Sequence, residues 1–252
     1  MATDPYGIIS HQSDDERSGR ERLFGLLKNC PIPEDQFLSN LGLFLDSKNL
    51  ARILFFDFLF RQIIDVQGVV MEFGIRWGQN LGLFSALRGI YDPFNRQRKI
   101  IGFDTFRGFP GISPEDGTSD MMKPNNLAVV DGYAEYLSEI LKAHESLNPL
   151  SHLDKFKLCA GDGPQELEKY LELAPETIIA LAYFDFDLYE PSLQCMELIK
   201  DRITKGSVIG LDEVNDPDSP GETKALMEAF GLKNIQLKRF PVASRVSYFV
   251  VE

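Results

Sequence analysis

The feature that most constrains the fold is an alternation that begins after Gly68. From there onward, short and almost continuous apolar runs are separated by segments with helical periodicity. Strands that are apolar at nearly every position are buried on both faces, as in a parallel sheet covered by helices on each side. We expect strands at residues 69–73, 99–103, 155–159, 177–184, 207–211, 235–238 and 246–251, and helices at 79–91, from 164 onward, at 191–203 and at 222–230.

The last two expected strands follow each other without a helix between them. Only a short turn at residues 240–244 joins them, so they form a hairpin and place one antiparallel strand at the end of the sheet. The sequence therefore predicts an α/β fold with a mostly parallel sheet between two layers of helices. Residues 105–131 break the alternation, and a loop of this length in a compact domain is typical of a functional lid.

The first 65 residues have a different character. Residues 1–20 are polar, and we expect them to be mobile. Residues 22–65 have a helical pattern interrupted by two prolines. Within it, residues 50–64 are apolar around most of the helix, so this helix needs cover from the main domain or from a second subunit. We therefore predict a polar tail and helical extension at 1–65, a main domain at 66–252, and a homo-oligomer.

The balance of charges argues against several classes of partner. The chain has 26 Lys and Arg against 38 Asp and Glu, a net charge of −12. Binding to nucleic acid or to an anionic membrane requires clustered basic residues, so we expect neither partner. The N-terminus carries acidic residues early, and the most apolar stretch, 53–64, is interrupted by Asp57 and Arg61. We therefore expect no signal peptide and no membrane span, and a soluble, cytoplasmic protein.

Ligands bind at the carboxyl ends of the strands in an open parallel sheet, so the residues that follow each strand are the candidate site. Glu72, Gly74 and Gly78 end the first strand and open the next helix. The glycines permit close approach of the backbone to a ligand. Glu72 would attract the amino group of a methionine-like moiety, although a structural turn with a buried acid is the alternative. Asp104 follows the second strand, where an acid can accept hydrogen bonds from a ribose diol.

Asp162 follows the third strand. It stands directly before Gly163 and Pro164, and proline is a favourable first residue of a helix. Asp162 either contacts the amino group of an adenine or caps this helix. The sequence favours neither of the two interpretations.

Four carboxylates follow the fourth and fifth strands: Asp185, Asp187, Asp212 and Glu213. Asp185 and Asp187 are two residues apart, so both point to one face while the strand continues. Four like charges at neighbouring strand ends repel each other unless a cation lies between them. Oxygen ligands without His or Cys suit Mg²⁺ or a similar hard divalent ion. The alternative is that individual acids are solvated loop residues or helix caps.

Four runs of sequence together resemble one known family. They lie at residues 68–78, 102–110, 184–192 and 206–213. Their order and spacing are similar to those of the macrocin O-methyltransferase (TylF-type) family of S-adenosylmethionine-dependent enzymes. The resemblance implies a class I methyltransferase fold, a Rossmann-like three-layer α/β/α domain around a seven-stranded sheet. It also implies methylation of a hydroxyl on a sugar or glycosylated natural product, with S-adenosylmethionine and Mg²⁺ or a similar divalent cation as cofactors.

The resemblance also implies roles for individual residues. Asp187 corresponds to the general base, and the metal ligands correspond to Asp185, Asp212 and Glu213. The cofactor contacts that we expect are Glu72, Gly74, Gly78, Asp104, Thr105 and Asp162. One position departs from the family pattern: Glu213 stands where a second Asp is usual, and Val214 follows it instead of Tyr.

Other functions are compatible with the same residues. One is O-methylation of a catechol-like aromatic diol, because vicinal hydroxyls chelate a metal in either case. Another is a non-catalytic module that binds a nucleoside or a protein, against which the four carboxylates argue. An NAD-dependent oxidoreductase is disfavoured, because the glycines do not have the Gly-x-Gly-x-x-Gly spacing and Glu72 would repel a pyrophosphate.

Overall fold

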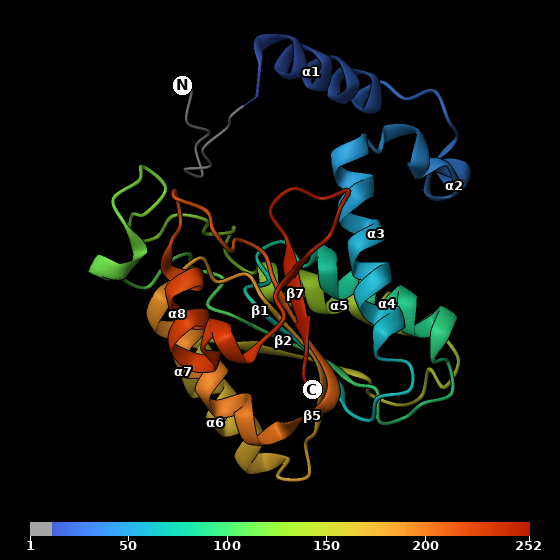
Figure 1. Cartoon of the computed structure of the whole chain (residues 1–252). Helices are drawn as coiled ribbons and strands as arrows, with labels where there is room; N and C mark the ends of the chain where they lie inside the picture. The colour runs from blue at the N-terminus through green and yellow to red at the C-terminus, as the bar shows by residue number, and fades with distance from the viewer. Residues whose placement is uncertain (1–11) are drawn as a thin grey trace.

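The computed structural model describes residues 12–252, which form a sheet flanked by helices and a helical arm at the N-terminal end (Figure 1). The strands are β1 (Val69–Phe73), β2 (Ile100–Asp104), β3 (Phe156–Ala160), β4 (Ile179–Phe184), β5 (Ile203–Leu211), β6 (Lys238–Arg239) and β7 (Ser247–Val250). The α-helices are α1 (Asp14–Lys28), α2 (Glu34–Phe37), α3 (Ser47–Gln62), α4 (Gln79–Tyr91), α5 (Tyr133–Ser146), α6 (Gly163–Leu173), α7 (Tyr189–Ile199) and α8 (Gly221–Phe230). No helix in this part of the chain has the length and apolar character needed to cross a membrane.

The strands form one sheet in the order β3-β2-β1-β4-β5-β7-β6. Strands β1 to β5 pair in parallel, whereas β7 is antiparallel to both β5 and β6. The predicted seven-stranded, mostly parallel sheet is therefore confirmed, together with its terminal hairpin. The expected strand at 235–238 is wrong in its bounds, because β6 begins only at Lys238. The strand order reverses between β1 and β4, and a doubly wound sheet forms its ligand crevice at such a point.

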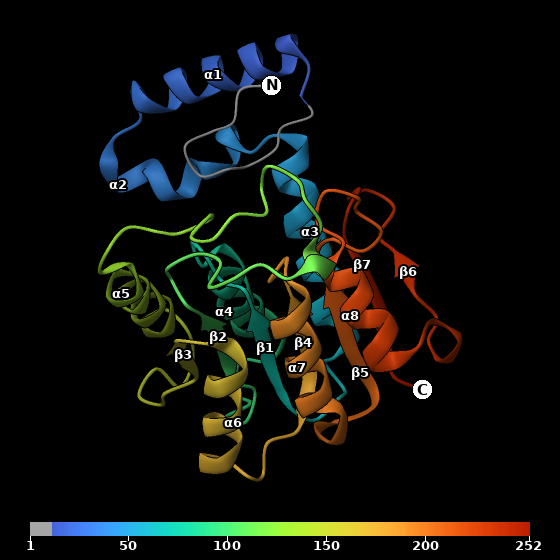
Figure 2. The same cartoon turned by 90° about the vertical axis from the view of Figure 1, so that its left-hand side faces the viewer.

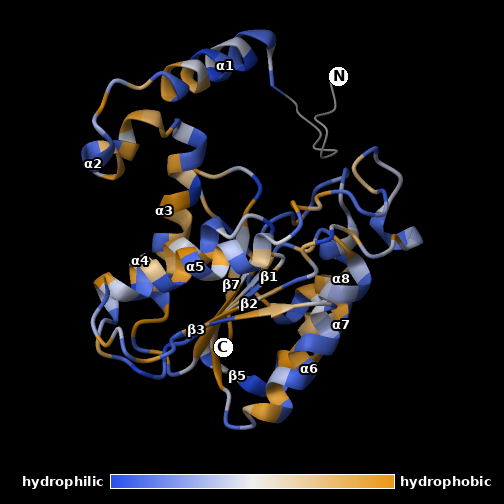
Figure 3. Cartoon of the chain, turned by 180° about the vertical axis from the view of Figure 1, so that it is seen from behind, coloured by the Kyte–Doolittle hydropathy of each residue, from blue (hydrophilic) through white to orange (hydrophobic). Residues whose placement is uncertain are grey.

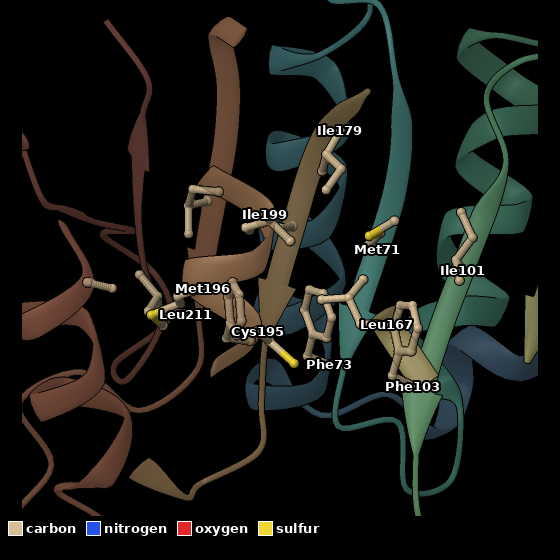
Figure 4. Close-up of a cluster of buried hydrophobic side chains, with 14 of the residues drawn as sticks. Met71, Phe73, Ile101, Phe103, Leu167, Ile179, Cys195, Met196, Ile199 and Leu211 are labelled. Atoms are coloured by element: carbon tan, nitrogen blue, oxygen red, sulfur yellow. The ribbon is translucent and has the colours of Figure 1, made fainter. Parts of the chain in front are cut away.

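Helices cover both faces of the sheet. α3, α4 and α5 lie on one face, and α6, α7 and α8 lie on the other (Figures 1 and 2). Each layer encloses its own apolar core. In the second of these cores, Phe73 and Phe103 of the sheet pack with Leu167 of α6 and with Cys195 and Met196 of α7 (Figure 4). The predicted three-layer arrangement is thus confirmed.

Helix α3 is part of the core of the sheet domain. Its side chains Phe55, Phe56, Leu59 and Phe60 are fully buried. The rings of Phe55 and Phe56 lie against Tyr183 of β4, with centroids 6.2 and 4.8 Å apart. The apolar helix expected to need cover therefore finds it on the main domain. The division of the chain at residue 65 stays a prediction.

The N-terminal helical arm begins earlier in the chain than the sequence pattern predicts. Residues 1–20 were expected to be a mobile polar tail, with helical structure only from residue 22, but α1 begins at Asp14, because Ser13 and Glu16 form a reciprocal capping box. Residues 1–11 of that segment lie outside the described residues. α1 contains no buried residue, and Figure 3 shows that the arm carries hydrophobic segments away from the sheet. The exposed large apolar side chains of this region are Phe24, Leu26, Leu38, Leu41, Leu43 and Leu45.

The expected lid, residues 105–131, contains no regular element except a short 3₁₀ turn at Pro114–Asp116. It is nevertheless attached to the domain. The buried carboxylate of Asp116 accepts a hydrogen bond from the backbone N–H of Tyr189 (2.6 Å), at the start of α7. Phe109, Met121 and Met122 of the segment form a small buried cluster with Leu188. The segment thus lies over the carboxyl ends of the strands as an ordered cover.

Loss of the α3 packing should destabilise the whole domain. Replacing Phe56 by Ala removes a fully buried ring, so we expect the free energy of unfolding to fall by about 3–5 kcal/mol. Leu54→Ala is the matched control, because Leu54 lies on the same helix but is 47% exposed. Urea unfolding followed by circular dichroism measures both changes, and equal losses for the two variants would contradict the assignment of α3 to the core.

Candidate active site

A cavity of about 350 Å³ opens at the carboxyl ends of the strands, a size typical of small-molecule sites. All the residues predicted for the site line this cavity except Glu72. The fold therefore brings these predicted residues together, although they are as much as 139 positions apart, from Gly74 to Glu213.

The turn after β1 is built for close backbone approach. Gly74 has φ +92°, and a side chain there would collide with the carbonyl oxygen of Asp185 at the end of β4. Gly78 has φ +75°, and a side chain there would collide with Leu137 of α5. Both positions therefore require glycine for conformation and for space. The turn packs directly against the chain at the end of β4. The ends of β1 and β4 therefore form one wall of the cavity.

Asp104 organises the same turn. Its Oδ2 accepts hydrogen bonds from the backbone N–H groups of Ile75 and Arg76, both at 2.7 Å, and its Oδ1 accepts one from Phe106 at 2.6 Å. These amides fix the carboxylate at the cavity wall, since backbone donors to an ionised acceptor form strong bonds. Thr105 also stabilises a turn, because its hydroxyl donates to the carbonyl of Gly108 at 2.9 Å. Contacts of these residues with a ribose stay predictions.

Glu72 lies behind the cavity wall. It is fully buried, and the side-chain amide of Asn80, which does line the cavity, donates to its Oε1 at 2.7 Å. Its Oε2 has no hydrogen-bond partner among the described residues. Burial raises the pKa of Glu72 to about 8, against the opposing effect of the Asn80 hydrogen bond. At neutral pH the side chain is therefore largely a neutral acid that ionises readily if a cation binds nearby.

Asp162 caps a helix, which was one of the two interpretations of this residue. Its Oδ1 accepts the backbone N–H of Gln165 at 3.2 Å, in the first turn of α6. Asp162 also lines the cavity, next to Gly163, where a side chain would collide with the ring of Phe186. Capping thus accounts for the residue, and contact with an adenine stays a prediction.

Asp185 and Asp212 converge on one cationic group, the guanidinium of Arg52. Its Nη2 lies 2.9 Å from Oδ2 of Asp185, and its Nη1 donates to Oδ1 of Asp212, which also accepts the hydroxyl of Tyr183. Burial and the nearby Asp212 raise the pKa of Asp185 well above its ordinary value. Although burial opposes it, the Arg52 charge and the Tyr183 hydroxyl lower the pKa of Asp212. The strand ends therefore do meet, as predicted, and a positive charge lies between the carboxylates.

Glu213 points to different partners. Its Oε1 forms an ion pair with Arg245, and its Oε2 accepts the hydroxyl of Ser219. Within residues 12–252, no group of three or more His, Cys, Asp or Glu side chains is arranged to hold a metal ion. The predicted trio of ligands is thus divided: Asp185 and Asp212 share one cation, and Glu213 is engaged elsewhere.

Asp187 has an unusual backbone conformation. Its φ of +62° lies in the left-handed region, which is costly for a residue other than glycine and is often found at functional sites. Burial and the charge of Asp212 raise the pKa of Asp187 to about 7, against the lowering effects of Arg245 and Arg76. A carboxylate with a pKa near the working pH is suited to accept a proton.

Several cavity residues were not found from the sequence. Arg52 comes from α3, and Arg245 comes from the turn before β7. In the sequence, neither residue directly follows one of the parallel strands. No local pattern marks them, because only the tertiary fold brings their charges to the acids. Trp77 and Asn80, by contrast, lie inside the glycine motif after β1. Their position in that motif could have identified them as cavity residues from the sequence. Apolar cover comes from Phe109, Met121, Leu127, Phe186 and Leu188.

Comparisons with known proteins agree with this geometry. Neither family models nor curated proteins give a match. Among solved structures, the chain is similar to the crystal structure of CalS11, a calicheamicin methyltransferase, with 40% sequence identity and a TM-score of 0.93 over 99% of this chain and 98% of that one. An apo structure of CalS11, named as a TDP-rhamnose 3'-O-methyltransferase of calicheamicin biosynthesis, gives 40% identity and a TM-score of 0.85 over 96% of each chain. This chain belongs to the TylF-type family of class I O-methyltransferases.

The family resemblance found in the sequence is thereby confirmed. The protein is an S-adenosylmethionine-dependent O-methyltransferase with the class I fold. A more distant structure, that of the O-methyltransferase NovP, shares the fold at 17% identity and a TM-score of 0.60, over 94% of this chain and 99% of that one.

Cofactor binding should be linked to the ionisation of Glu72. The ammonium group of S-adenosylhomocysteine favours the carboxylate form, so binding below pH 8 should release a proton, and the affinity should rise with pH from 6 to 8. Isothermal titration calorimetry in two buffers of different ionisation enthalpy counts the protons released. Glu72→Gln keeps the shape and should bind more weakly, with fewer protons released. The same proton count in both proteins would exclude Glu72 from this role.

Proposed function

We propose that this O-methyltransferase methylates a hydroxyl of a sugar, and that a nucleotide-activated deoxysugar is the first acceptor to test. The observation that carries this proposal is the 40% identity over almost the whole length of CalS11, which is named as acting on TDP-rhamnose. The cavity is compatible with such an acceptor, because Arg76 and Arg245 line it together with the acids. Arginine is suited to the phosphate groups of a nucleotide.

We assign the cofactor to the β1 and β2 side of the cavity. The turn from Gly74 to Gly78 allows a ligand to approach the backbone closely. Glu72 lies beneath the cofactor amino group, and Asp104 with Thr105 flanks the ribose. Asp162 and Gly163 border the adenine, close to the ring of Phe186. This arrangement leaves the β4 and β5 side for the acceptor.

Asp187 then acts as the general base. The acceptor oxygen forms a bond with the methyl carbon of the cofactor as the bond from that carbon to sulfur breaks, and the hydroxyl proton passes to the Asp187 carboxylate. The products are the methyl ether and S-adenosylhomocysteine. Holding the acceptor oxygen, the methyl carbon and the cofactor sulfur in line lowers the activation barrier further and so increases the rate of transfer. The apolar side chains of the 105–131 segment limit access of water to this place.

The divalent metal expected from the sequence stays a prediction. Mg²⁺ is commonly held by one or two carboxylates together with water and substrate oxygens. Asp185 and Asp212 share the guanidinium of Arg52, whereas Glu213 is paired with Arg245. A metal held by Asp185 and Asp212 would act as a Lewis acid on the acceptor hydroxyl. Glu213 serves instead to hold Arg245 at the cavity.

The expected homo-oligomer and the expected cytoplasmic location stay predictions. The exposed apolar side chains of the arm, such as Leu38 at 78% and Leu43 at 64%, support association with another copy. Light scattering coupled to size-exclusion chromatography measures the mass in solution.

An acceptor screen tests the proposed activity. Formation of S-adenosylhomocysteine is measured by mass spectrometry with TDP-deoxysugars, free sugars, glycosylated natural products and catechols as acceptors. We expect turnover with the nucleotide sugars. Turnover confined to catechols would favour the aromatic alternative, and cofactor binding without transfer to any acceptor would favour a non-catalytic module.

Asp187→Asn should remove the base while it preserves the fold, because Asn tolerates the left-handed backbone conformation. We expect kcat to fall by at least about 100-fold, with the affinity for S-adenosylhomocysteine little changed. Asp120→Asn is the control, since Asp120 belongs to the cover segment and is 74% exposed. Full activity of the Asp187 variant on a verified acceptor would exclude it as the base.

A further inference from the structure

The backbone around Asp187 is held by residues that are distant from it in the sequence. Asp187 has a φ of +62°, and a residue other than glycine keeps such a conformation only when the surrounding structure supports it. α7 begins two residues later, at Tyr189, and its N-cap residue, Leu188, offers no side-chain acceptor to the N–H groups of the first turn. The support and the acceptor therefore have to come from another segment.

Asp116 of the cover segment (residues 105–131) supplies that acceptor. Oδ1 of its buried carboxylate accepts the backbone N–H of Tyr189 at 2.6 Å. Its Oδ2 accepts the backbone N–H and the hydroxyl of Ser113, at 2.7 and 2.8 Å, so the side chain is fixed within its own segment. Leu188 belongs to the small buried cluster that the same segment forms. Both residues that follow the base are thus attached to the cover segment.

The start of α8 packs against the same place, at Gly221. A Cβ atom on Gly221 would lie 2.5 Å from Oδ1 of Asp116 and 2.6 Å from the nitrogen of Tyr189. It would also lie 2.9 Å from the carbonyl oxygen of Asp187. The turn that carries Asp116 lies beside the start of α8 (Figure 2). The cover segment, α8 and the chain beside the base therefore meet at one crossing that has no room for a side chain.

We propose that Asp116 is a positioning residue for methyl transfer: through the N–H of Tyr189 it fixes the backbone that presents the Asp187 carboxylate to the acceptor hydroxyl. This inference rests on the proposed role of Asp187 as the general base. It gives the cover segment a second task besides the exclusion of water. Because a displacement of about 1 Å in a reacting group lowers the rate strongly, the hydrogen bond of Asp116 should affect kcat.

The first pair of variants removes or keeps this hydrogen bond. Asp116→Ala removes both carboxylate oxygens, whereas Asp116→Asn keeps Oδ1 as an acceptor for the N–H of Tyr189. Ser119→Ala is the matched control. The Ser119 hydroxyl donates to the carbonyl oxygen of Asp218 at 2.6 Å, so this change removes another attachment of the cover segment without touching the chain beside the base.

A second pair of variants disturbs the crossing by size alone. Gly221→Ala keeps every hydrogen-bonding group and forces a methyl group between the three segments. Gly111→Ala is its control, because it adds the same methyl group to the cover segment at a position with no other atom within 4 Å. If Asp116→Ala fails to fold, Gly221→Ala provides the same test. Circular dichroism and thermal melting establish that each variant is folded.

Steady-state kinetics are measured with S-adenosylmethionine and TDP-rhamnose, or the acceptor that the screen identifies. We expect kcat to fall about tenfold or more in Asp116→Ala and in Gly221→Ala, with both KM values within about twofold of the wild type. Asp116→Asn should recover most of the lost kcat. Ser119→Ala and Gly111→Ala should remain within about twofold of the wild type.

A double-mutant cycle separates positioning of the base from a merely structural role. In a protein that already carries Asp187→Asn, Asp116→Ala should cause no further fall in kcat, because no base remains to be positioned. A structural role would lower kcat by the same factor in both backgrounds.

The outcomes for the inference and for the proposed function can be told apart. If folded Asp116→Ala keeps the kcat of the wild type, or if the two substitutions multiply, Asp116 does not position the base, while the role of Asp187 stands. If Asp187→Asn alone is fully active, or if no acceptor is methylated, the proposed base fails and the inference fails with it.

Discussion

Buried carboxylates must be neutralised, and this constraint determines the arrangement of the site. Parallel strands end at one edge of the sheet, so β4 and β5 bring the partly buried Asp185 together with the buried Asp212. Such groups are stable only when they are protonated or paired with a cation. The chain uses both solutions: Arg52 and Arg245 supply positive charge, and burial raises the pKa of Asp185. The arginines and the strand ends are therefore one electrostatic unit.

The same unit links the packing of the core to the chemistry. The rings of Phe55 and Phe56 pack against the ring of Tyr183. The hydroxyl of Tyr183 in turn donates a hydrogen bond to Asp212. Arg52 reaches Asp212 from the same helix. A shift of α3 would therefore move both the counter-charge and a hydrogen-bond donor of the acidic centre. On this basis α3 is a wall of the site, although its position in the sequence suggests an accessory segment.

Much of the fold could be predicted from the sequence, because strands that are buried on both faces are apolar at nearly every position. The apolar runs of β1 and β4 and the acids after them identified the sheet and the edge at which ligands bind. Other elements were missed for definable reasons. The first half of α1 was assigned to a polar tail, although Ser13 and Glu16 carry the spacing of a capping box. α5 was not predicted, since its buried side chains, such as Leu137 and Leu141, are few and follow a long irregular segment.

The sequence by itself determined the class of the fold, the cavity edge and nearly all the predicted residues that line it. These follow from periodicity and from the rule that parallel strands end together. Only the tertiary structure decided which charges meet. Arg52 and Arg245 lie far along the chain from the acids they pair with, and no local pattern records a contact between distant segments. Glu213 shows the consequence: it stands beside Asp212 in the sequence, yet its side chain turns to Arg245, because pairing depends on direction in space.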